Sequence, residues 1–199
     1  MSTGNVLRRT TMGLIWLTAG AAAFGQAGAR PTAPPREELF RNVEGLTRHF
    51  DVVYGQDDPA YQQLDAYIVR SDEPSPVLMR YHAGGYIGGN KSEFIGRTAG
   101  KYEAFLNAGI SVVSCHYRLA PKYEFPAPLL DTARSIQFVR SKAKEWNIDP
   151  NRIACVGGSA GGHLATWIAL APDLATPASD DPIARQSSRV SCFIGCGPL

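Results

Sequence analysis

The sequence predicts an α/β fold in which helices cover both faces of a mainly parallel sheet. Between residues 77 and 194, short apolar runs alternate with longer stretches of helical character, and this alternation is typical of parallel strands joined by crossover helices. Two of the apolar runs pass directly into glycine-rich turns, at Gly84-Gly85 and at Gly157-Gly158. With 199 residues and a hydrophobic content of 44%, the chain has the ordinary composition of one globular domain.

The N-terminal segment, residues 1–29, has the pattern of a secretory signal peptide. Arg8 and Arg9 precede an apolar run from Met12 to Phe24, and Ala27-Gly28-Ala29 supplies small residues for cleavage at its end. The apolar run is shorter than the roughly 20 residues that span a bilayer, so we expect no stable membrane span. We therefore expect a secreted or periplasmic protein, while the export route stays open.

Residues 30–48 are expected to form a Pro-rich linker, 30–36, and a short helix, about 37–46. The globular domain, residues 49–199, is expected to begin with two antiparallel strands joined through a turn region at residues 55–59. The expected elements of this domain, in chain order, are strands 49–54, 65–69 and 77–81, helix 97–108, strand 110–115, helix 129–145, strand 152–156, helix 161–170 and strand 189–194.

A Gly-x-Ser-x-Gly pattern follows the apolar run from Ile153 to Val156. Ser159 stands at its centre, between Gly157 and Gly161, where the expected strand ends and the next helix begins. At such a bend the serine backbone is strained and strand and helix approach closely, so side chains two residues to either side would collide. This arrangement is a nucleophile elbow, and Ser159 is therefore the candidate nucleophile.

A second glycine cluster follows the third expected strand and consists of His82-Ala83-Gly84-Gly85-Tyr86. Acyl transfer requires hydrogen-bond donors aimed at the oxyanion of the tetrahedral intermediate, and glycine amides approach that oxygen without a side chain in the way. We expect the amides of Gly84 and Gly85 to serve as these donors. In the elbow arrangement the residue after the nucleophile adds another amide, here Ala160, at the positive end of its helix. An ordinary glycine turn is the alternative interpretation, and the serine motif downstream argues against it.

Two more motifs complete a family pattern. Tyr117-Arg118-Leu119-Ala120-Pro121 follows an expected strand, and Phe125-Pro126-Ala127-Pro128-Leu129-Leu130-Asp131 leads into an expected helix. Together with the two glycine motifs, in this order, they resemble the α/β-hydrolase superfamily. Within it, the chain is similar to the esterases and lipases related to hormone-sensitive lipase and to bacterial feruloyl and acetyl xylan esterases. The resemblance runs from about Phe50 to Gly197.

This resemblance implies roles for the residues of the two glycine motifs. The implied nucleophile and oxyanion hole are Ser159 and the amides of Gly84, Gly85 and Ala160. His82 corresponds to the histidine that shapes the glycine loop in this group, and not to its base. The family usually has a third glycine where this chain has Ala83, and the added methyl group need not block the two amides that follow.

The acid and the base of the family's triad have no counterpart in this sequence. The superfamily's chain order is Ser, then Asp or Glu, then His, and no histidine follows His163. His163 lies four residues after Ser159, where we expect a packing or substrate-rim residue and keep a base as the alternative. The later aspartates, Asp173, Asp180 and Asp181, lie in a Pro-rich connection that comes too early for the family acid. The remaining histidines, His49 and His116, are expected to have local structural roles.

We therefore expect an incomplete form of the family's fold, lacking its last strands and helices, as in a fragment or a truncated reading frame. The strand at 189–194 would then form a sheet edge with unpaired backbone groups and an uncovered apolar face. Such a chain is expected to be marginally stable, prone to aggregation or dependent on a partner that covers the edge.

Charge and cysteine content argue against several other classes. The formal net charge is +2 without a long basic run, so we expect no nucleic-acid partner. The Cys/His spacing typical of zinc sites is missing from the sequence, and we expect no metal and no cofactor. Cys115 and Cys155 fall inside expected strands, and Cys192 and Cys196 lie around the last one. Cysteines in such positions usually behave as small buried apolar residues, while a reactive thiol or a bridge between the last two stays open.

The sequence thus favours a secreted serine carboxylester hydrolase, esterase-like or lipase-like, that acts on a small-molecule or carbohydrate ester with impaired turnover. One alternative is a catalytically inactive binding or scaffold protein of the same fold. Another is an amide hydrolase similar to the formamidases, because the motif His-Ala-Gly-Gly-Tyr is also similar to one in that group. The acyl group, the alcohol and the oligomeric state are not determined by the sequence.

Overall fold

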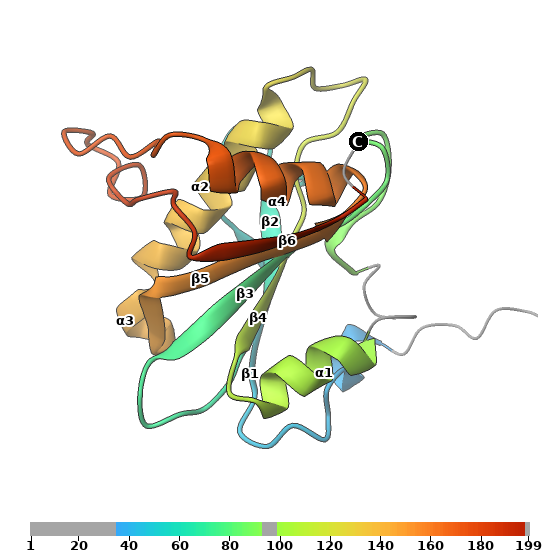
Figure 1. The fold of residues 1–199 in the computed structure, drawn as a ribbon, viewed down its shortest axis with the longest axis vertical. Helices are drawn as coiled ribbons and strands as arrows, with labels where there is room; N and C mark the ends of the chain where they lie inside the picture. The colour runs from blue at the N-terminus through green and yellow to red at the C-terminus, as the bar shows by residue number, and fades with distance from the viewer. Residues whose placement is uncertain (1–34, 93–98, 198–199) are drawn as a thin grey trace, which may run out of the picture. The chain divides into compact units, whose positions relative to one another are not determined.

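The computed structural model of the chain describes residues 35–92 and 99–197. The expected signal peptide at 1–29 and most of the expected linker at 30–36 lie outside the described residues. Within them, strands form one sheet in the order β1-β2-β4-β3-β5-β6 (Figure 1). The strands are β1 (Thr47–Val53), β2 (Gln63–Ile68), β3 (Ser75–Tyr81), β4 (Ser111–Cys115), β5 (Ile148–Gly158) and β6 (Cys192–Cys196).

The sheet is mainly parallel, as the sequence predicts. β1 pairs antiparallel with β2, and β2 pairs antiparallel with β4, whereas β4, β3, β5 and β6 are parallel to one another. Tyr81 pairs with Gly157 in the register of β3 and β5. This register brings the ends of both strands, each followed by a glycine motif, to the same edge of the sheet.

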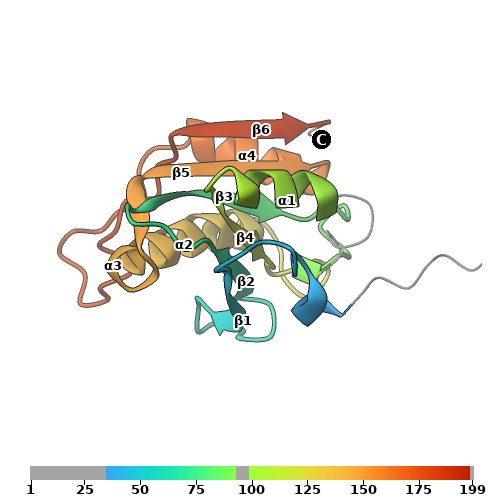
Figure 2. The ribbon, with the colours of Figure 1, turned by 90° about the horizontal axis from the view of Figure 1, so that it is seen from below.

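Helices lie on both faces of the sheet, as expected (Figure 2). The helices are α1 (Ala99–Asn107), α2 (Ala127–Ser141), α3 (Ala143–Trp146) and α4 (Ala160–Leu170), and a 3-10 turn spans Arg36–Glu38. α1 lies on one side of the sheet, and α2 and α4 lie on the other. Neighbouring residues of β4 show the division: Val112 packs with Leu106 of α1, whereas Val113 belongs to the cluster that contains Ile136 of α2 and Leu164 of α4.

The expected helix at residues 37–46 is wrong. Beyond the 3-10 turn the chain forms a series of turns, and Phe40 has a φ of 55°, which is outside the helical region. The side chains of Leu39 and Phe40 are buried in the cluster on the α1 side. Their carbonyls accept hydrogen bonds from the Arg48 guanidinium at 2.9 and 3.1 Å. Apolar burial and this arginine therefore replace the helical hydrogen bonds.

The last strand begins later than expected. Pairing with β5 starts where the Ser191 amide donates to the Ile153 carbonyl at 2.8 Å. The chain just before it is held by polar groups instead, because Asp173 accepts hydrogen bonds from the Ser187 hydroxyl and the Ser188 amide. These contacts keep residues 187–189 out of the strand.

The cysteines divide into two pairs. Cys115 and Cys155 are fully buried, and burial raises the pKa of the Cys115 thiol to about 12. Cys192 and Cys196 are exposed and free, so the expectation of burial is wrong for this pair. They stand at the two ends of one extended strand, about 13 Å apart at roughly 3.3 Å per residue, which excludes a bridge between them.

Candidate active site

Ser159 has the geometry of a nucleophile elbow. It is the N-cap residue of α4 and directly follows β5, with φ 50° and ψ −122°. A Cβ atom at position 157 would lie 2.2 Å from the carbonyl carbon of Gly161, and one at position 161 would lie 2.2 Å from the Tyr81 carbonyl oxygen. Real Cβ atoms do not approach backbone atoms so closely, so the tight bend at Ser159 requires both glycines.

The side chain of Ser159 is available for reaction. Its amide donates to the Cys196 carbonyl at 2.9 Å, and its carbonyl accepts from the His163 amide at 2.9 Å. Its hydroxyl has no hydrogen-bond partner among residues 35–92 and 99–197, and the residue is partly exposed. The backbone is therefore fixed by β6 and α4, whereas the hydroxyl makes no hydrogen bond within the described ranges.

The glycine loop after β3 has an unusual backbone. Gly84, Gly85 and Tyr86 have consecutive positive φ angles of 126°, 59° and 65°. The Gly84 carbonyl turns back to accept from the amides of Ile87 and Gly88, both at 3.1 Å. The amides of Gly84 and Gly85 donate to no carbonyl within the described part of the chain, and both residues are exposed. Two amides are thus free for an incoming oxygen.

Tyr86 joins this loop to the elbow. Its hydroxyl lies 3.1 Å from the Ala160 carbonyl oxygen and 2.7 Å from Nδ1 of His163. Its ring also contacts Phe125, with 4.9 Å between centroids, and burial raises the pKa of Tyr86 to about 12. The structure therefore brings the two glycine motifs together, although Tyr86 was not singled out by the sequence. No local pattern marks it, because the hydrogen-bond partners of its hydroxyl lie 74 and 77 residues away.

His82 is completely buried beneath the loop. Its Nδ1 lies 2.7 Å from the Ala83 carbonyl oxygen, and its Nε2 lies 2.8 Å from Nδ1 of His116. Burial lowers the pKa of His82 to about 3. A buried, neutral ring whose two nitrogens are both occupied fits a structural role in the loop, and it does not fit a general base.

His116 is a further residue that the sequence analysis did not place at the site. The register of β3 and β4 pairs Tyr81 with Cys115, so the next residues of the two strands, His82 and His116, become neighbours. This register was the signal that could have identified the contact. Burial, followed by the charge of Lys91, lowers the pKa of His116 to about 4.

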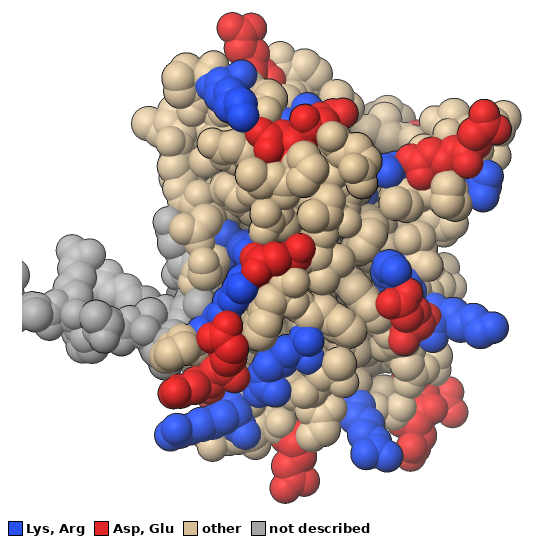
Figure 3. Space-filling view, turned by 180° about the vertical axis from the view of Figure 1, so that it is seen from behind, with Lys and Arg blue, Asp and Glu red and all other residues tan. Residues whose placement is uncertain are grey.

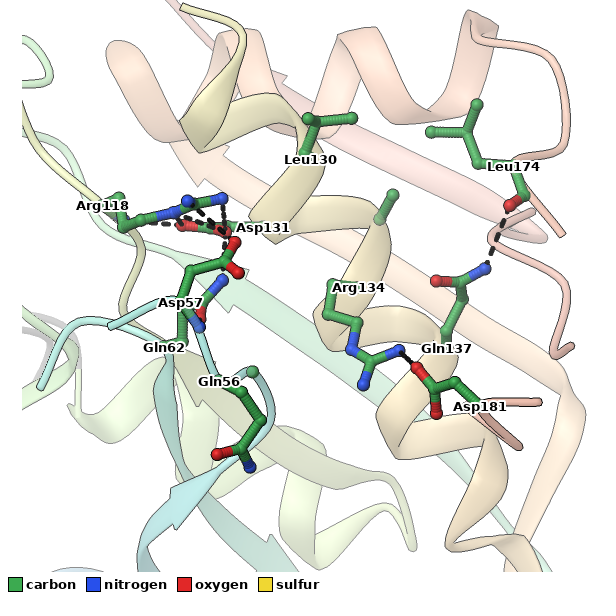
Figure 4. A pocket seen from close by; sticks show the side chains of 12 residues that line it. Gln56, Asp57, Gln62, Arg118, Leu130, Asp131, Arg134, Gln137, Leu174 and Asp181 are labelled. Atoms are coloured by element: carbon green, nitrogen blue, oxygen red, sulfur yellow. Dashed lines mark hydrogen bonds and ion pairs between the residues drawn. The ribbon is translucent and has the colours of Figure 1, made fainter. Parts of the chain in front are cut away.

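A buried ion pair joins the motif at residues 117–121 to the motif at residues 125–131. The Arg118 guanidinium lies 2.8 Å from Asp131, whose side chain is 1% exposed, and the Arg118 amide also donates to that carboxylate at 2.8 Å. Gln62 donates a further hydrogen bond to Asp131 at 2.7 Å. This group lines one side of a polar cavity of about 460 Å³, whose other side includes Arg134 and its partner Asp181 (Figure 4).

The other candidates from the sequence have structural partners. His163 contacts Tyr86, and no described carboxylate contacts its ring. His49 stacks on Trp146 at 5.1 Å. Asp173 binds the serines before β6, and Asp181 pairs with Arg134.

On the face seen in Figure 3, acidic and basic side chains are intermixed. Groups of three or more metal-ligating side chains do not occur in the described ranges. None of the helices in these ranges combines the length and apolar character needed to cross a bilayer.

Comparisons with known proteins agree with this geometry. Residues 64–192 match the BD-FAE family model. The chain is 33% identical over 170 residues to the probable carboxylic ester hydrolase LipM of Mycobacterium tuberculosis, covering 83% of this chain and 37% of that protein. It is 37% identical over 105 residues to carboxylesterase NlhH of the same organism, covering 51% of this chain and 31% of that protein. The chain thus spans about a third of the length of these curated relatives.

Two solved structures have a similar fold. An acetyl ester-xyloside bifunctional hydrolase from Caldicellulosiruptor lactoaceticus has a TM-score of 0.60 at 38% identity, covering 71% of this chain and 52% of that chain. Thermogutta terrifontis esterase 2 phosphorylated by paraoxon has a TM-score of 0.60 at 26% identity, covering 79% of this chain and 58% of that chain. The described sheet and helices therefore correspond to about half of each esterase.

Proposed function

The chain belongs to the BD-FAE family of α/β-hydrolase esterases, and from this premise we propose that it is a serine carboxylester hydrolase with Ser159 as its nucleophile. The observation that carries the proposal is the pairing of two features at one edge of the sheet. Ser159 has a strained backbone and an unpaired hydroxyl, and the adjoining loop presents unpaired glycine amides.

In the proposed reaction, Oγ of Ser159 attacks the ester carbonyl carbon and its proton passes to a base. The amides of Gly84, Gly85 and Ala160 donate hydrogen bonds to the oxyanion that forms. The tetrahedral intermediate then collapses, the alcohol leaves with a proton, and an acyl-serine remains. Water hydrolyses this ester, releases the acid and restores the hydroxyl.

We further propose that proton transfer limits this chain. Among residues 160–199, His163 is the only histidine, and its Nδ1 contacts the Tyr86 hydroxyl instead of a carboxylate. A base that no acid orients accepts the serine proton poorly. The residual rate is then the part supplied by binding and by the oxyanion hole, roughly 10³ to 10⁴ over water in serine hydrolases that lack their triad.

A fluorophosphonate probe tests the activated serine directly, because it phosphonylates only nucleophilic hydroxyls. We expect slow labelling of the purified chain and none of Ser159→Ala. Added imidazole should accelerate labelling of the parent chain, because it supplies the missing base. If the parent chain is not labelled with or without imidazole, Ser159 is not an activated nucleophile.

The proposed substrate is a small-molecule ester or a carbohydrate ester. The carbohydrate class is supported by the 38% identical relative, which is described as an acetyl ester-xyloside hydrolase. A panel of p-nitrophenyl acetate, acetylated xylo-oligosaccharides and the corresponding amides separates the classes. Turnover of the amides alone would favour the formamidase-like alternative over ester hydrolysis.

A catalytically inactive binding protein is the second candidate, and the contact of His163 with Tyr86 favours it. In that case the surface formed by Ser159 and the glycine loop would hold an ester without cleaving it. Calorimetry would then show binding that persists in Ser159→Ala, together with no turnover by the parent chain.

We also propose that the protein is exported to the periplasm or the medium, on the basis of the signal-peptide pattern in residues 1–29. N-terminal sequencing of the protein recovered from these fractions should find Arg30 as the first residue. Recovery only from the cytoplasm with residues 1–29 intact would contradict the export proposal.

A further inference from the structure

Buried His82 and half-buried His116 link the segment after β4 to the glycine loop after β3. Nε2 of His82 lies 2.8 Å from Nδ1 of His116, and Nδ1 of His82 lies 2.7 Å from the carbonyl oxygen of Ala83. His82 is fully buried. The reaction proposed above uses neither ring as an acid or a base, so these hydrogen bonds have another role.

The hydrogen-bond pattern assigns the protons of both rings. The Ala83 carbonyl can only accept, so Nδ1 of His82 carries a hydrogen. In a neutral ring Nε2 of His82 is then an acceptor, and Nδ1 of His116 must donate to it. The alternative is a charged His82, and complete burial disfavours an imidazolium with no carboxylate beside it.

The bond from His82 to Ala83 also sets the direction of the next amide. The Ala83 carbonyl and the Gly84 N–H belong to one planar trans peptide, in which they point in opposite directions. Fixing the carbonyl toward His82 therefore fixes the Gly84 N–H away from it, toward the open side of the loop. This N–H is one of the donors proposed for the oxyanion.

Close packing shows that this peptide plane has little freedom. A Cβ atom at position 89 would lie 2.4 Å from the Ala83 oxygen and 2.5 Å from Nδ1 of His82. The backbone at Gly89 therefore packs closely against this hydrogen bond. On the other side, the Tyr117 ring stacks on His82 at 4.2 Å between centroids, and its hydroxyl donates to the His82 carbonyl at 2.7 Å.

We propose that His116 is a positioning residue for the oxyanion hole: its Nδ1–H holds His82 in the Nδ1–H tautomer and thereby holds the Gly84 amide in its donating direction. The role of this amide in stabilising an oxyanion rests on the proposed esterase function. The tautomers of His82 and His116 do not depend on that function. The tautomers and the role of the Gly84 amide are therefore tested separately.

Long-range ¹H–¹⁵N spectra of the full chain test the proton arrangement, because they distinguish protonated from unprotonated ring nitrogens. We expect protonated Nδ1 and unprotonated Nε2 in both His82 and His116 at neutral pH. A spectrum with Nε2 of His82 protonated would overturn the proposal without any variant.

A pair of variants tests the coupling to the loop. The Tyr61 ring stacks on His116 at 5.2 Å between centroids. His116→Leu leaves an apolar side chain to pack against Tyr61 but removes the donor, whereas His116→Asn retains an N–H close to the position of Nδ1. We expect the leucine variant to lose the single tautomer of His82 and to shift the Gly84 amide resonance, and the asparagine variant to preserve both. Unchanged spectra in the leucine variant would show that His116 does not hold the tautomer of His82 or the Gly84 amide. Circular dichroism melts check that both variants are folded.

The rate of fluorophosphonate labelling at Ser159 tests the consequence for the site. Removing one oxyanion donor from a serine hydrolase typically costs about 10² to 10³ in rate, so we expect at least a ten-fold loss for His116→Leu and recovery to within a few-fold for His116→Asn. If the parent chain is not labelled, the esterase proposal fails while the tautomer result stands. If the leucine variant is labelled at the parental rate, His116 does not position the donor.

Discussion

Single residues at the elbow are constrained by backbone contacts. A methyl group on Gly161 would lie 2.2 Å from the Tyr81 carbonyl oxygen and 2.7 Å from that of His82. These backbone atoms belong to the last residue of β3 and the residue after it, and they cannot rotate away as a side chain would. Gly161→Ala must therefore separate α4 from β3, which also carries the glycine loop.

We expect Gly161→Ala to lower the free energy of unfolding by about 1 to 3 kcal/mol, the usual cost of overpacking, and to slow labelling of Ser159. Gly100→Ala is the matched control, because a Cβ atom there meets nothing within 4 Å and Gly100 lies within α1. It should be neutral or stabilising by up to about 1 kcal/mol. Urea denaturation of both variants provides the measurement, and an equal effect at the two positions would contradict the steric explanation.

His82, which is buried, and His116, which is half-buried, predict a pH dependence of stability. The folded pKa values of about 3 for His82 and about 4 for His116 lie below the ordinary 6.5. Both rings stay neutral in the folded chain while the unfolded chain takes up protons below pH 6.5. Their contribution to stability is therefore fully present above pH 6.5 and is lost as the pH falls toward 4 and then 3.

The expected slope is at most about 1.4 kcal/mol per pH unit for each histidine, and it is smaller for His116, which is partly exposed to solvent. Urea unfolding between about pH 7 and pH 5 avoids most carboxylate titration. His116→Asn removes one titrating group and should reduce the slope. The same slope in the parent chain and this variant would show that His116 is not neutral in the folded state.

Residues with a local signature were predictable from the sequence, and residues with remote partners were not. The strained serine requires glycine two positions to either side, so the elbow can be recognised from a short sequence motif. Tyr86 and His116 have no such signature, because their contacts with His163 and His82 span 77 and 34 residues. Their importance appears only once the parallel register of the strands is known.

At the scale of elements, the Arg118–Asp131 pair holds the segment after β4 against the start of α2. Both side chains are withdrawn from water, at 12% and 1% exposure. Removing one partner leaves the other charge buried, which typically costs 3 to 5 kcal/mol. Asp57 also lies 2.9 Å from Arg118 and partly compensates for the loss.

We therefore expect Asp131→Ala to lower the free energy of unfolding by about 3 kcal/mol, at the lower end of that range. Lys142→Ala serves as the control, since it breaks a more exposed ion pair with Glu145 and should have no measurable effect. Denaturant titrations of the two variants measure both free energies of unfolding. A parental unfolding curve for Asp131→Ala would mean that the motifs are held together by packing alone.

The central strands were predicted to within a few residues because apolar β-branched runs bounded by glycine and proline favour strands regardless of context. The helix expected at 37–46 is wrong, and the strand expected at 189–194 begins only at Cys192, for a different reason. Arg48 satisfies the carbonyls of the first segment, and Asp173 satisfies the amide and hydroxyls before β6. The first contacts span 8 and 9 residues and the second 14 and 15 residues, so they lie outside the helix and strand periodicities and outweigh local preference.

At the scale of the whole described fold, the two sheet faces differ in how well they are covered. α2 and α4 cover β3 and β5 on one face, whereas the cluster beneath α1 contains residues of β2 and β4 but none of β5 or β6. An apolar cavity of about 270 Å³ lies there, lined by residues that include Val77, Phe105 and Ile194.

This uncovered face predicts that a chain of these residues associates with itself. β6 is the last strand in the order of the described sheet, and no strand within residues 35–92 and 99–197 pairs with its outer side. Ile194 is 49% exposed beside the cavity. Edge strands next to apolar surface pair with other chains.

Ile194→Lys places a charge in this surface and should lower the average mass in sedimentation at high protein concentration. Leu170→Lys changes a residue that is 75% exposed at the end of α4, away from the cavity, and should leave association unchanged. A parent chain that stays monomeric at all concentrations, or two lysine variants that behave alike, would show that β6 and its apolar neighbours do not drive association.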